Sequence, residues 1–240
     1  TDLQNAINAA ADNDTIYVQQ SNTNYGFITL NKSLTIIGRS HNDPNYQAEI
    51  GDIDLNNGAS NSLIRGLKIG LIDDSIGLNN TISNLEFIDC DIDSVSINPS
   101  QNQSIINILI RGNIIRFNFN VSQTTNSIVK NNIFFNDGAS NIAFDSDTVF
   151  SNNILIGINP TGYTFSIGNG LNIVDNCIFL IESSSTETIT FDDTTQKILE
   201  IRNSITYNYG SGDFNFEMSN NITLINNQEN VDPLFTFLEG

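Results

Sequence analysis

Four of the nine lysine and arginine residues of this 240-residue chain occupy the same position in a recurring triplet. Arg65, Arg111, Lys130 and Arg202 each follow an apolar residue and precede Gly or Asn. If the apolar residue points inward on a β-strand, the alternation of side chains turns the basic residue outward. The four residues would then form one surface column, with Arg111 and Lys130 on successive repeats roughly 5 Å apart. Adjacent cations of this kind could bind the carboxylate of an acidic sugar.

A purely structural interpretation of this column remains open. Outward side chains on a strand are solvated, and Arg or Lys there can lie across neighbouring repeats and pair with Asp or Glu. An exposed ion pair stabilises a fold by only about 0 to 1 kcal/mol, so stability alone gives little reason for such a column.

The segment DCDIDS places three carboxylates at alternate positions, Asp89, Asp91 and Asp93. On one strand all three would face outward, while Cys90 and Ile92 would face inward. Calcium takes six to eight oxygen ligands and would relieve the mutual repulsion of these carboxylates. Alternate residues on a strand lie about 7 Å apart, so one ion would need further ligands from another repeat. The segment therefore indicates either a calcium site or a plain acidic strand.

Aromatic residues near the C-terminus offer a second kind of sugar contact. Tyr207 and Tyr209 share one face of an expected strand, and Phe214 and Phe216 share one face of the next. An exposed aromatic ring presents a flat apolar face on which a sugar can stack. The tyrosine pair is therefore a candidate glycan-binding surface, with packing in the core as the alternative.

The elements that position these residues follow from the spacing of the triplet, an apolar residue, any residue, and then Gly or Asn. It occurs nine times, at intervals of 18 to 28 residues. Gly and Asn are the residues that most readily adopt a positive φ, which bends a strand sharply. Each third residue is therefore predicted to be a corner, and the nine corners are Gly38, Gly66, Asn84, Gly112, Asn131, Asn152, Asn176, Asn203 and Asn227.

Between the corners the chain runs in short segments rich in Ile, Val, Phe and Thr, which is typical of strands. A period of about 20 to 30 residues, with a corner at the same point of each repeat, indicates a solenoid. We predict an all-β fold, a right-handed parallel β-helix of about nine coils spanning residues 15–240. Its coils would stack about 4.8 Å apart around a core of Ile and Phe.

The two ends of this single β-helix domain differ. Leu3, Ala6, Ile7 and Ala10 fall on one face of a helix, so residues 1–14 are predicted to form a short helix that caps the first coil. The final residues, NVDPLFTFLEG, supply no obvious cap. We therefore expect the natural chain to continue into further domains.

The two cysteines are predicted to be free. Cys90 and Cys177 lie four coils apart in this arrangement, which separates their backbones by about 19 Å. A disulfide needs Cα atoms within about 7 Å of each other, so both thiols should be reduced and buried.

The charge balance narrows the choice of partner. The formal net charge is -18 and the sequence pI is about 4.1, which argues against nucleic acid and against anionic membrane surfaces. No run of about 18 apolar residues occurs, so no membrane insertion is expected. The chain begins without the basic and apolar regions of a signal peptide, which is either absent, removed or outside this sequence.

The opening LQNAINAAADNDTIYV, followed by YGFITLNKSLTIIG, resembles the start of bacterial right-handed β-helix repeat proteins of the pectin-lyase-like superfamily. In those proteins a short helix precedes a D-T-I-x-V strand and a strand similar to KSLTIIG. The terminal VDPLF is similar to a phrase near the end of secreted members, especially those from Bacteroidetes. The resemblance covers nearly the whole chain and implies a secreted or cell-surface location. The superfamily contains lyases, hydrolases, esterases, adhesins and phage spikes, so the resemblance implies a fold more than a function.

For a polysaccharide lyase, the resemblance implies that Arg111 or Lys130 abstracts a proton beside a uronate carboxylate that calcium or another cation neutralises. The polygalacturonase-like branch instead needs paired carboxylates within N-T-D, D-D, G-H-G and R-I-K motifs, and this chain lacks a matching set. Our leading hypothesis is a non-catalytic extracellular module that serves as a surface scaffold or binds a polysaccharide or cell-surface glycan. A polysaccharide lyase and a purely structural spacer are the alternatives.

Overall fold

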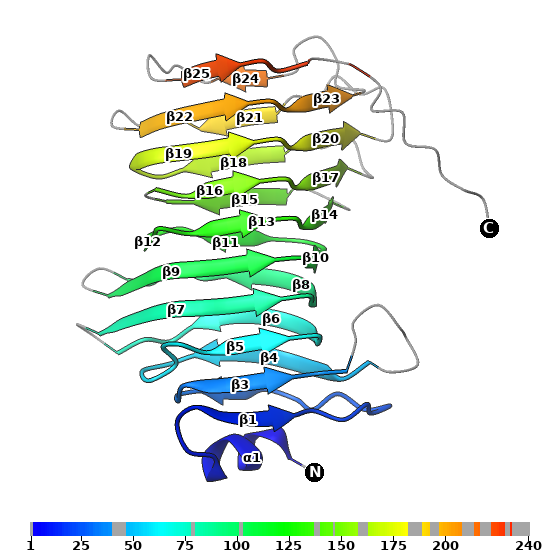
Figure 1. Cartoon of the computed structure of the whole chain (residues 1–240), viewed down its shortest axis with the longest axis vertical. Helices are drawn as coiled ribbons and strands as arrows, with labels where there is room; N and C mark the ends of the chain where they lie inside the picture. Colours follow the sequence, from blue (N-terminus) through cyan, green and yellow to red (C-terminus); the bar gives the residue numbers. More distant parts are fainter. Residues whose placement is uncertain are drawn as a thin grey trace, which may run out of the picture.

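The computed structural model describes residues 2–39, 47–77, 80–100, 103–136, 140–145, 147–157, 163–181, 189–192, 197–207, 214–216, 222–228 and 231. Strands from successive turns of the chain stack along one long axis, with the single short helix at the N-terminal end (Figure 1). The pairings between the described strands are parallel. The predicted parallel β-solenoid is therefore confirmed.

One sheet receives one strand from each coil. In chain order these strands are β1 (Asp14–Tyr17), β3 (Leu34–Ile37), β5 (Leu63–Arg65), β7 (Thr81–Ile88), β9 (Ser104–Arg111), β13 (Ile128–Lys130), β16 (Val149–Ser151), β19 (Gly170–Asp175), β22 (Lys197–Arg202) and β25 (Ile222–Ile225), with β12 (Thr124–Thr125) beside β9. This path holds ten of the sheet's 11 strands, so the coil count differs slightly from the nine expected.

The second sheet begins with one short strand and three longer strands, and then divides into two limbs. Its first strands are β2 (Ile28–Leu30), β4 (Glu49–Leu55), β6 (Lys68–Asp74) and β8 (Asp91–Ser96). One limb continues with β10 (Ile114–Ile115), β14 (Ile133–Asn136), β17 (Ile154–Gly157), β20 (Ile178–Ile181) and β23 (Ile205–Tyr207). The other limb continues with β11 (Phe119–Val121), β15 (Ser140–Phe144), β18 (Tyr163–Ile167), β21 (Ile189–Asp192) and β24 (Phe214–Phe216). Each coil beyond β8 therefore has three faces.

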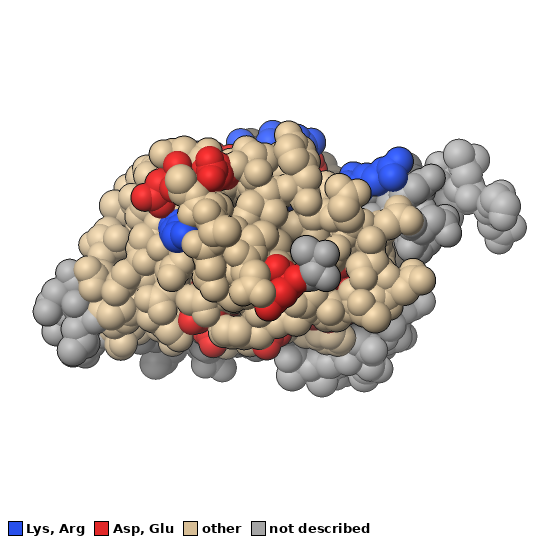
Figure 2. All heavy atoms as spheres, turned by 90° about the horizontal axis from the view of Figure 1, so that it is seen from below, with Lys and Arg blue, Asp and Glu red and all other residues tan. Residues whose placement is uncertain are grey.

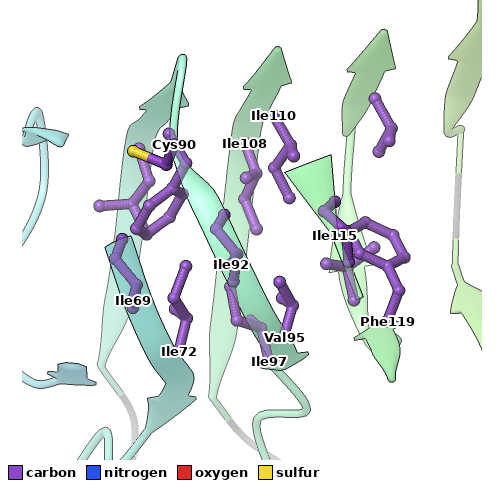
Figure 3. Packing of buried hydrophobic residues seen from close by; sticks show 14 of the residues in the cluster. Ile69, Ile72, Cys90, Ile92, Val95, Ile97, Ile108, Ile110, Ile115 and Phe119 are labelled. Atoms are coloured by element: carbon purple, nitrogen blue, oxygen red, sulfur yellow. The ribbon is translucent and has the colours of Figure 1, made fainter. Parts of the chain in front are cut away.

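Inward side chains from all faces fill one continuous apolar core. Isoleucines dominate it around β6 to β10, where Ile69, Ile92 and Ile115 stack in register from coil to coil (Figure 3). Further along, Phe134, Phe150 and Phe165 belong to a chain of aromatic contacts with ring centroids 5.3 to 6.2 Å apart. Burial of one such side chain stabilises a fold by roughly 1.5 to 3 kcal/mol, so the stacked rows hold the coils together.

The corner that follows the first sheet is a single column of residues. Each corner N–H donates to the carbonyl that precedes the next corner, as from Gly66 to Ile88 at 3.2 Å and from Asn176 to Arg202 at 3.0 Å. By this ladder the corners are Gly38, Gly66, Asp89, Gly112, Asn131, Asn152, Asn176, Asn203 and Asn226. All except Gly38 have a positive φ, from 51° to 71°.

Two of the nine predicted corners are wrong. Asp89 occupies the column where Asn84 was expected, because Asn84 belongs to a different bend with its own positive φ of 58°. There its Oδ1 accepts from Asn107 Nδ2 at 2.9 Å, within a separate outer ladder of asparagines. Near the C-terminus the corner is Asn226, and Asn227 is the residue after it.

The position directly after the corner is buried in seven of the nine coils, those with corners from Gly66 to Asn203, and in several of them it links one coil to the next. Asn113, Asn132 and Asn153 occupy it in three successive coils. The Oδ1 of Asn132 accepts from the Asn113 backbone N–H at 2.9 Å, and its Nδ2 donates to the Ile110 carbonyl at 3.1 Å. Asn113 and Asn153 each bind the preceding coil in the same way. These amides satisfy backbone groups that the bend would otherwise bury without a partner.

The short helix α1 (Leu3–Ala9) is the predicted N-terminal cap, and it is shorter than residues 1–14. Asp2 begins it, because its side chain accepts from the Gln4 backbone N–H at 2.9 Å. Leu3 and Ile7 are buried against the core. Lys32 closes the other end of the helix, since its Nζ donates to the carbonyls of three residues in or after the last turn, Ile7, Asn8 and Ala10.

At the opposite end, β25 is the last strand of the first sheet. Leu224 is in register with the buried Ile201, which makes it an inward position. It is nevertheless 47% exposed. Among the described residues, none stacks on this strand in the way that α1 packs at the first coil.

The asparagine ladder predicts a specific stability loss. Asn132→Ala leaves the buried Asn113 N–H without its acceptor and the Ile110 carbonyl without its donor. Each group left unsatisfied lowers the free energy of unfolding by about 1 to 3 kcal/mol. Urea unfolding should show a loss in this range or above. Asn118→Ala, at an exposed asparagine, should change stability by less than about 0.5 kcal/mol. Equal losses in the two variants would contradict a special role for the ladder.

The free cysteines make a second prediction. Cys90 and Cys177 are free, as predicted, and occupy the ladder position in two other coils. Burial raises the pKa of each thiol to about 12, so neither forms a reactive thiolate near neutral pH. A thiol-specific reagent at about pH 8 should label neither in the folded protein and both after unfolding in urea. Rapid labelling of the folded protein would show that these coils open.

Candidate functional site

The basic triplet residues lie in one outward row at the end of the first sheet. Strand register arranges this row as Tyr17, Ile37, Arg65, Ile88, Arg111, Lys130, Ser151, Asp175, Arg202 and Ile225. Arg111 and Lys130 are in direct register on adjacent strands, as predicted. The other two basic residues are separated from this pair, because Ile88 lies before Arg111 and two coils lie between Lys130 and Arg202. The predicted basic column is therefore interrupted.

Ion pairing divides these four residues into two groups. Arg65 Nη2 lies 3.0 Å from Asp89 Oδ2, and Arg202 lies 3.5 Å from a carboxylate oxygen of Asp175 and 3.5 Å from one of Glu200. The structural interpretation therefore holds for Arg65 and Arg202. In the described part of the chain, no ion pair engages Arg111 or Lys130. These two adjacent cations keep their charge available to a ligand.

A groove of about 630 Å³ runs along the corner column beside this row. Its floor crosses five coils, at Gly38, Gly66, Asp89, Gly112 and Asn131. Arg39, Arg65, Ile37, Ile114 and Ile133 also line it. Arg111 and Lys130 directly precede two of the floor residues, Gly112 and Asn131, but are not themselves among the residues that line the groove. Seen from the N-terminal end, Lys and Arg atoms lie along the upper margin of the molecule and at one place on the left beside an acidic patch, and further acidic patches lie lower down (Figure 2).

Glycine at the corners keeps the floor of the groove low. At Gly38 an added Cβ would clash with the carbonyl of Gly66, and at Gly112 it would lie 2.6 Å from Asp89 Oδ1. Beyond Asn131 the column continues with asparagines, and Asn176 Nδ2 donates to Asn152 Oδ1 at 2.7 Å across that surface. The groove therefore coincides with the coils in which the corner is mostly glycine.

Asp89, Asp91 and Asp93 do not form the expected set of three outward carboxylates on one strand. Asp89 is a corner residue paired with Arg65. Asp91 begins β8, is covered by Arg116, and accepts from its Nε at 2.8 Å and its Nη2 at 2.7 Å. Two arginines thus relieve the repulsion for which a calcium site was one of the two interpretations. The described residues contain no group of three or more His, Cys, Asp and Glu that could hold a metal ion.

Asp93 belongs to a mixed charge cluster on β4, β6 and β8. Burial raises the pKa of this carboxyl above its usual value, and the nearby Asp91 and Glu49 raise it further. Lys68 and Arg116 oppose the shift. Since Lys68 pairs with Glu49 at 3.3 Å and Arg116 pairs with Asp91, the cations of this cluster are already engaged.

Tyr207 does not line the groove. It is in register with Leu180 on β20, in the limb of the second sheet that also carries Ile114 and Ile133, and its strand β23 lies three strands beyond that of Ile133. Tyr209 lies outside the described residues. A different aromatic residue was missed. Tyr17 is 70% exposed and is the first member of the row that contains Arg111. The triplet pattern does not identify Tyr17, because the residue that follows it is Val18 and not Gly or Asn.

No protein-family model matches this chain, and no curated protein matches it. Among solved structures, it is similar to one described as the crystal structure of PfbA, a surface adhesin of Streptococcus pneumoniae. That similarity covers 95% of this chain and 86% of the other, with 11% sequence identity and a TM-score of 0.25. So low a TM-score carries no argument about function. In the part of the chain that the structure describes, no helix is long and apolar enough to cross a membrane.

Two of the arginine–aspartate pairs, Arg116–Asp91 and Arg65–Asp89, predict different costs of mutation. Arg116→Gln leaves Asp91, whose side chain is 7% exposed, without its cation, and should destabilise the fold by roughly 2 to 4 kcal/mol. Arg65→Gln breaks a pair whose side chains are 57% and 41% exposed, and should cost less than about 1 kcal/mol. Thermal unfolding of both variants tests this order. A larger loss in Arg65→Gln would contradict it.

Proposed function

We propose that this chain is a non-catalytic surface module that binds an acidic glycan along the groove, with Arg111 and Lys130 as the groups that hold a sugar carboxylate. The observation that carries the proposal is the direct register of these two cations, together with the lack of an ion pair to either among the described residues. Hydrogen bonds between a cation and a carboxylate are among the stronger polar contacts that a protein can offer a ligand.

The negative charge of the whole protein means that an acidic glycan must be held by contacts at short range. With a formal net charge of -18, the protein as a whole repels a polyanion, so binding needs a local concentration of positive charge. The row beside the groove provides it at two adjacent rungs, about 4.8 Å apart. This spacing is comparable to the length of one sugar unit in an extended polysaccharide. A glycan lying parallel to the solenoid axis would therefore meet each cation in turn.

The shape of the groove supports a polymer over a small molecule. It is open along its length and crosses five coils, and its walls combine polar groups with the apolar side chains of Ile114 and Ile133. Sugars present both hydroxyl edges and apolar faces, so this mixture suits them. We place the module on a cell surface or in a secreted protein with further domains, since long acidic polysaccharides occur outside the cell.

Binding measurements on the intact chain test the proposal. Alginate, polygalacturonate and hyaluronan oligosaccharides of equal length would be titrated into wild type and into the double variant Arg111→Ala/Lys130→Ala. We expect binding of at least one oligosaccharide and a loss of about tenfold or more in the double variant, because two charge-assisted contacts disappear. Arg202→Ala is the matched control, since this arginine belongs to the same row but is paired with Asp175 and Glu200 and lies three strands beyond Lys130, and it should change affinity by less than about twofold.

Two outcomes would contradict the proposal. Absence of binding to every oligosaccharide would favour a structural spacer. A time-dependent rise in ultraviolet absorbance from an unsaturated uronate, lost in the double variant, would instead show a polysaccharide lyase.

A further inference from the structure

We infer that the ligand of this groove is a mixed glycan in which a neutral sugar adjoins the acidic one, and that Asp89 selects against a continuous polyuronate. This inference rests on the proposed function, because it takes Arg111 and Lys130 as the site of the acidic sugar. It assigns a separate neutral subsite to the ion pair of Arg65 and Asp89. The groove would then prefer a polymer in which acidic and neutral sugars alternate over one in which every sugar is acidic.

The geometry of the ion pair leaves hydrogen-bonding capacity on both partners. Arg65 directs Nε and Nη2 to the same oxygen of Asp89, Oδ2, at 3.1 and 3.0 Å. The other oxygen, Oδ1, lies over Gly112, whose missing Cβ leaves it room. No hydrogen bond from a described residue reaches Oδ1. Both residues line the groove, so Oδ1 and the remaining guanidinium N–H groups face a ligand together.

This combination suits a hydroxyl group and disfavours a carboxylate. A carboxylate such as Asp89 only accepts hydrogen bonds, and a guanidinium only donates them. A sugar hydroxyl does both, so it can donate to Asp89 Oδ1 and accept from Arg65. A uronate carboxylate can only accept, so it would compete with Asp89 for Arg65 and meet a like charge at close range. The pair therefore forms a subsite for a neutral sugar.

The neutral subsite and the cationic pair lie on neighbouring coils. The Asp89 backbone N–H donates to the carbonyl of Arg111 at 3.0 Å, which fixes these two residues on adjacent rungs. Lys130 lies on the rung after Arg111. A polymer that advances about one sugar per rung, about 4.8 Å, would bring a neutral unit to Asp89 and an acidic unit to the cations. One wall of the groove, at Ile114 and Ile133, is apolar along these coils.

The fold does not require a charge at position 89. The corners at Asn131, Asn152, Asn176 and Asn203 adopt φ values of 51° to 58°, and Asp89 adopts 53°. Asparagine and glycine are the residues that tolerate this conformation best. Asparagine at position 89 would adopt the same corner conformation, so the negative charge of the Asp89 carboxylate is available to act on a ligand. Asp89→Asn retains the corner and removes the charge, and Asp89→Gly provides a second variant with the same backbone tolerance.

The experiment compares two ligands of equal length on the intact chain. Hyaluronan oligosaccharides alternate glucuronate with neutral N-acetylglucosamine, and oligogalacturonates carry a carboxylate on every unit. Wild type should prefer the hyaluronan oligosaccharide. Asp89→Asn and Asp89→Gly should bind the oligogalacturonate about fivefold or more tightly than wild type does, because Arg65 is released and the like charge is gone. The control Asp175→Asn removes the same charge from the pair with Arg202 outside the groove and should change neither affinity.

The possible failures can be told apart. If wild type binds oligogalacturonate as tightly as the hyaluronan oligosaccharide, and the Asp89 variants leave both affinities unchanged, the neutral subsite is wrong while the acidic glycan site stands. If Asp175→Asn strengthens oligogalacturonate binding as much as Asp89→Asn does, the gain reflects net charge alone, and the inference is again wrong. If no variant binds either ligand, the proposed function fails, and this inference fails with it.

Discussion

The structure depends on one recurring interaction, the hydrogen bonds that a buried asparagine amide makes to the coil before it. Asn132 accepts from the Asn113 N–H and donates to the Ile110 carbonyl, so it bridges two backbone groups on either side of a bend. A sharp bend interrupts the regular ladder and would leave such groups buried without partners. Because the amide restores both bonds at one fixed position, it holds the coils that carry Asn113, Asn132 and Asn153 in a single register over the preceding ones.

That register is what makes a functional surface possible. When coils stack without slipping, outward residues form straight rows, and Arg111 lies beside Lys130 although 19 residues separate them in the chain. The corner residues then decide the shape of the surface. Where the corner is glycine, as at Gly112, the surface is hollow, and where it is asparagine, as at Asn152, a side chain occupies the same place. The choice of glycine or asparagine at a corner therefore meets the requirement for a positive φ and also determines where on the surface a ligand can lie.

The sequence was sufficient to predict the solenoid, the helical cap and the adjacency of Arg111 and Lys130, because each follows from local pattern and period. It failed where two residues could satisfy the same pattern. Asn84 has the corner conformation but belongs to another bend, and in the pair Asn226–Asn227 the first residue, not the second, is the corner. The ion pairs were also beyond the sequence, since Asp89 meets Arg65 across 24 residues. Only the stacking of coils reveals which charges are neutralised and which remain available.

The most direct test of the central claim is to map where an acidic glycan binds the folded chain. At 26.4 kDa the protein suits NMR, and a hyaluronan oligosaccharide can be titrated while backbone and arginine Nε–H signals are followed. The account predicts that the largest shifts occur along the groove, at the Arg65 and Arg111 side chains and the Gly112 and Asn131 backbone. Shifts confined to the other limb of the second sheet, from β11 to β18, with the groove signals unchanged, would contradict it.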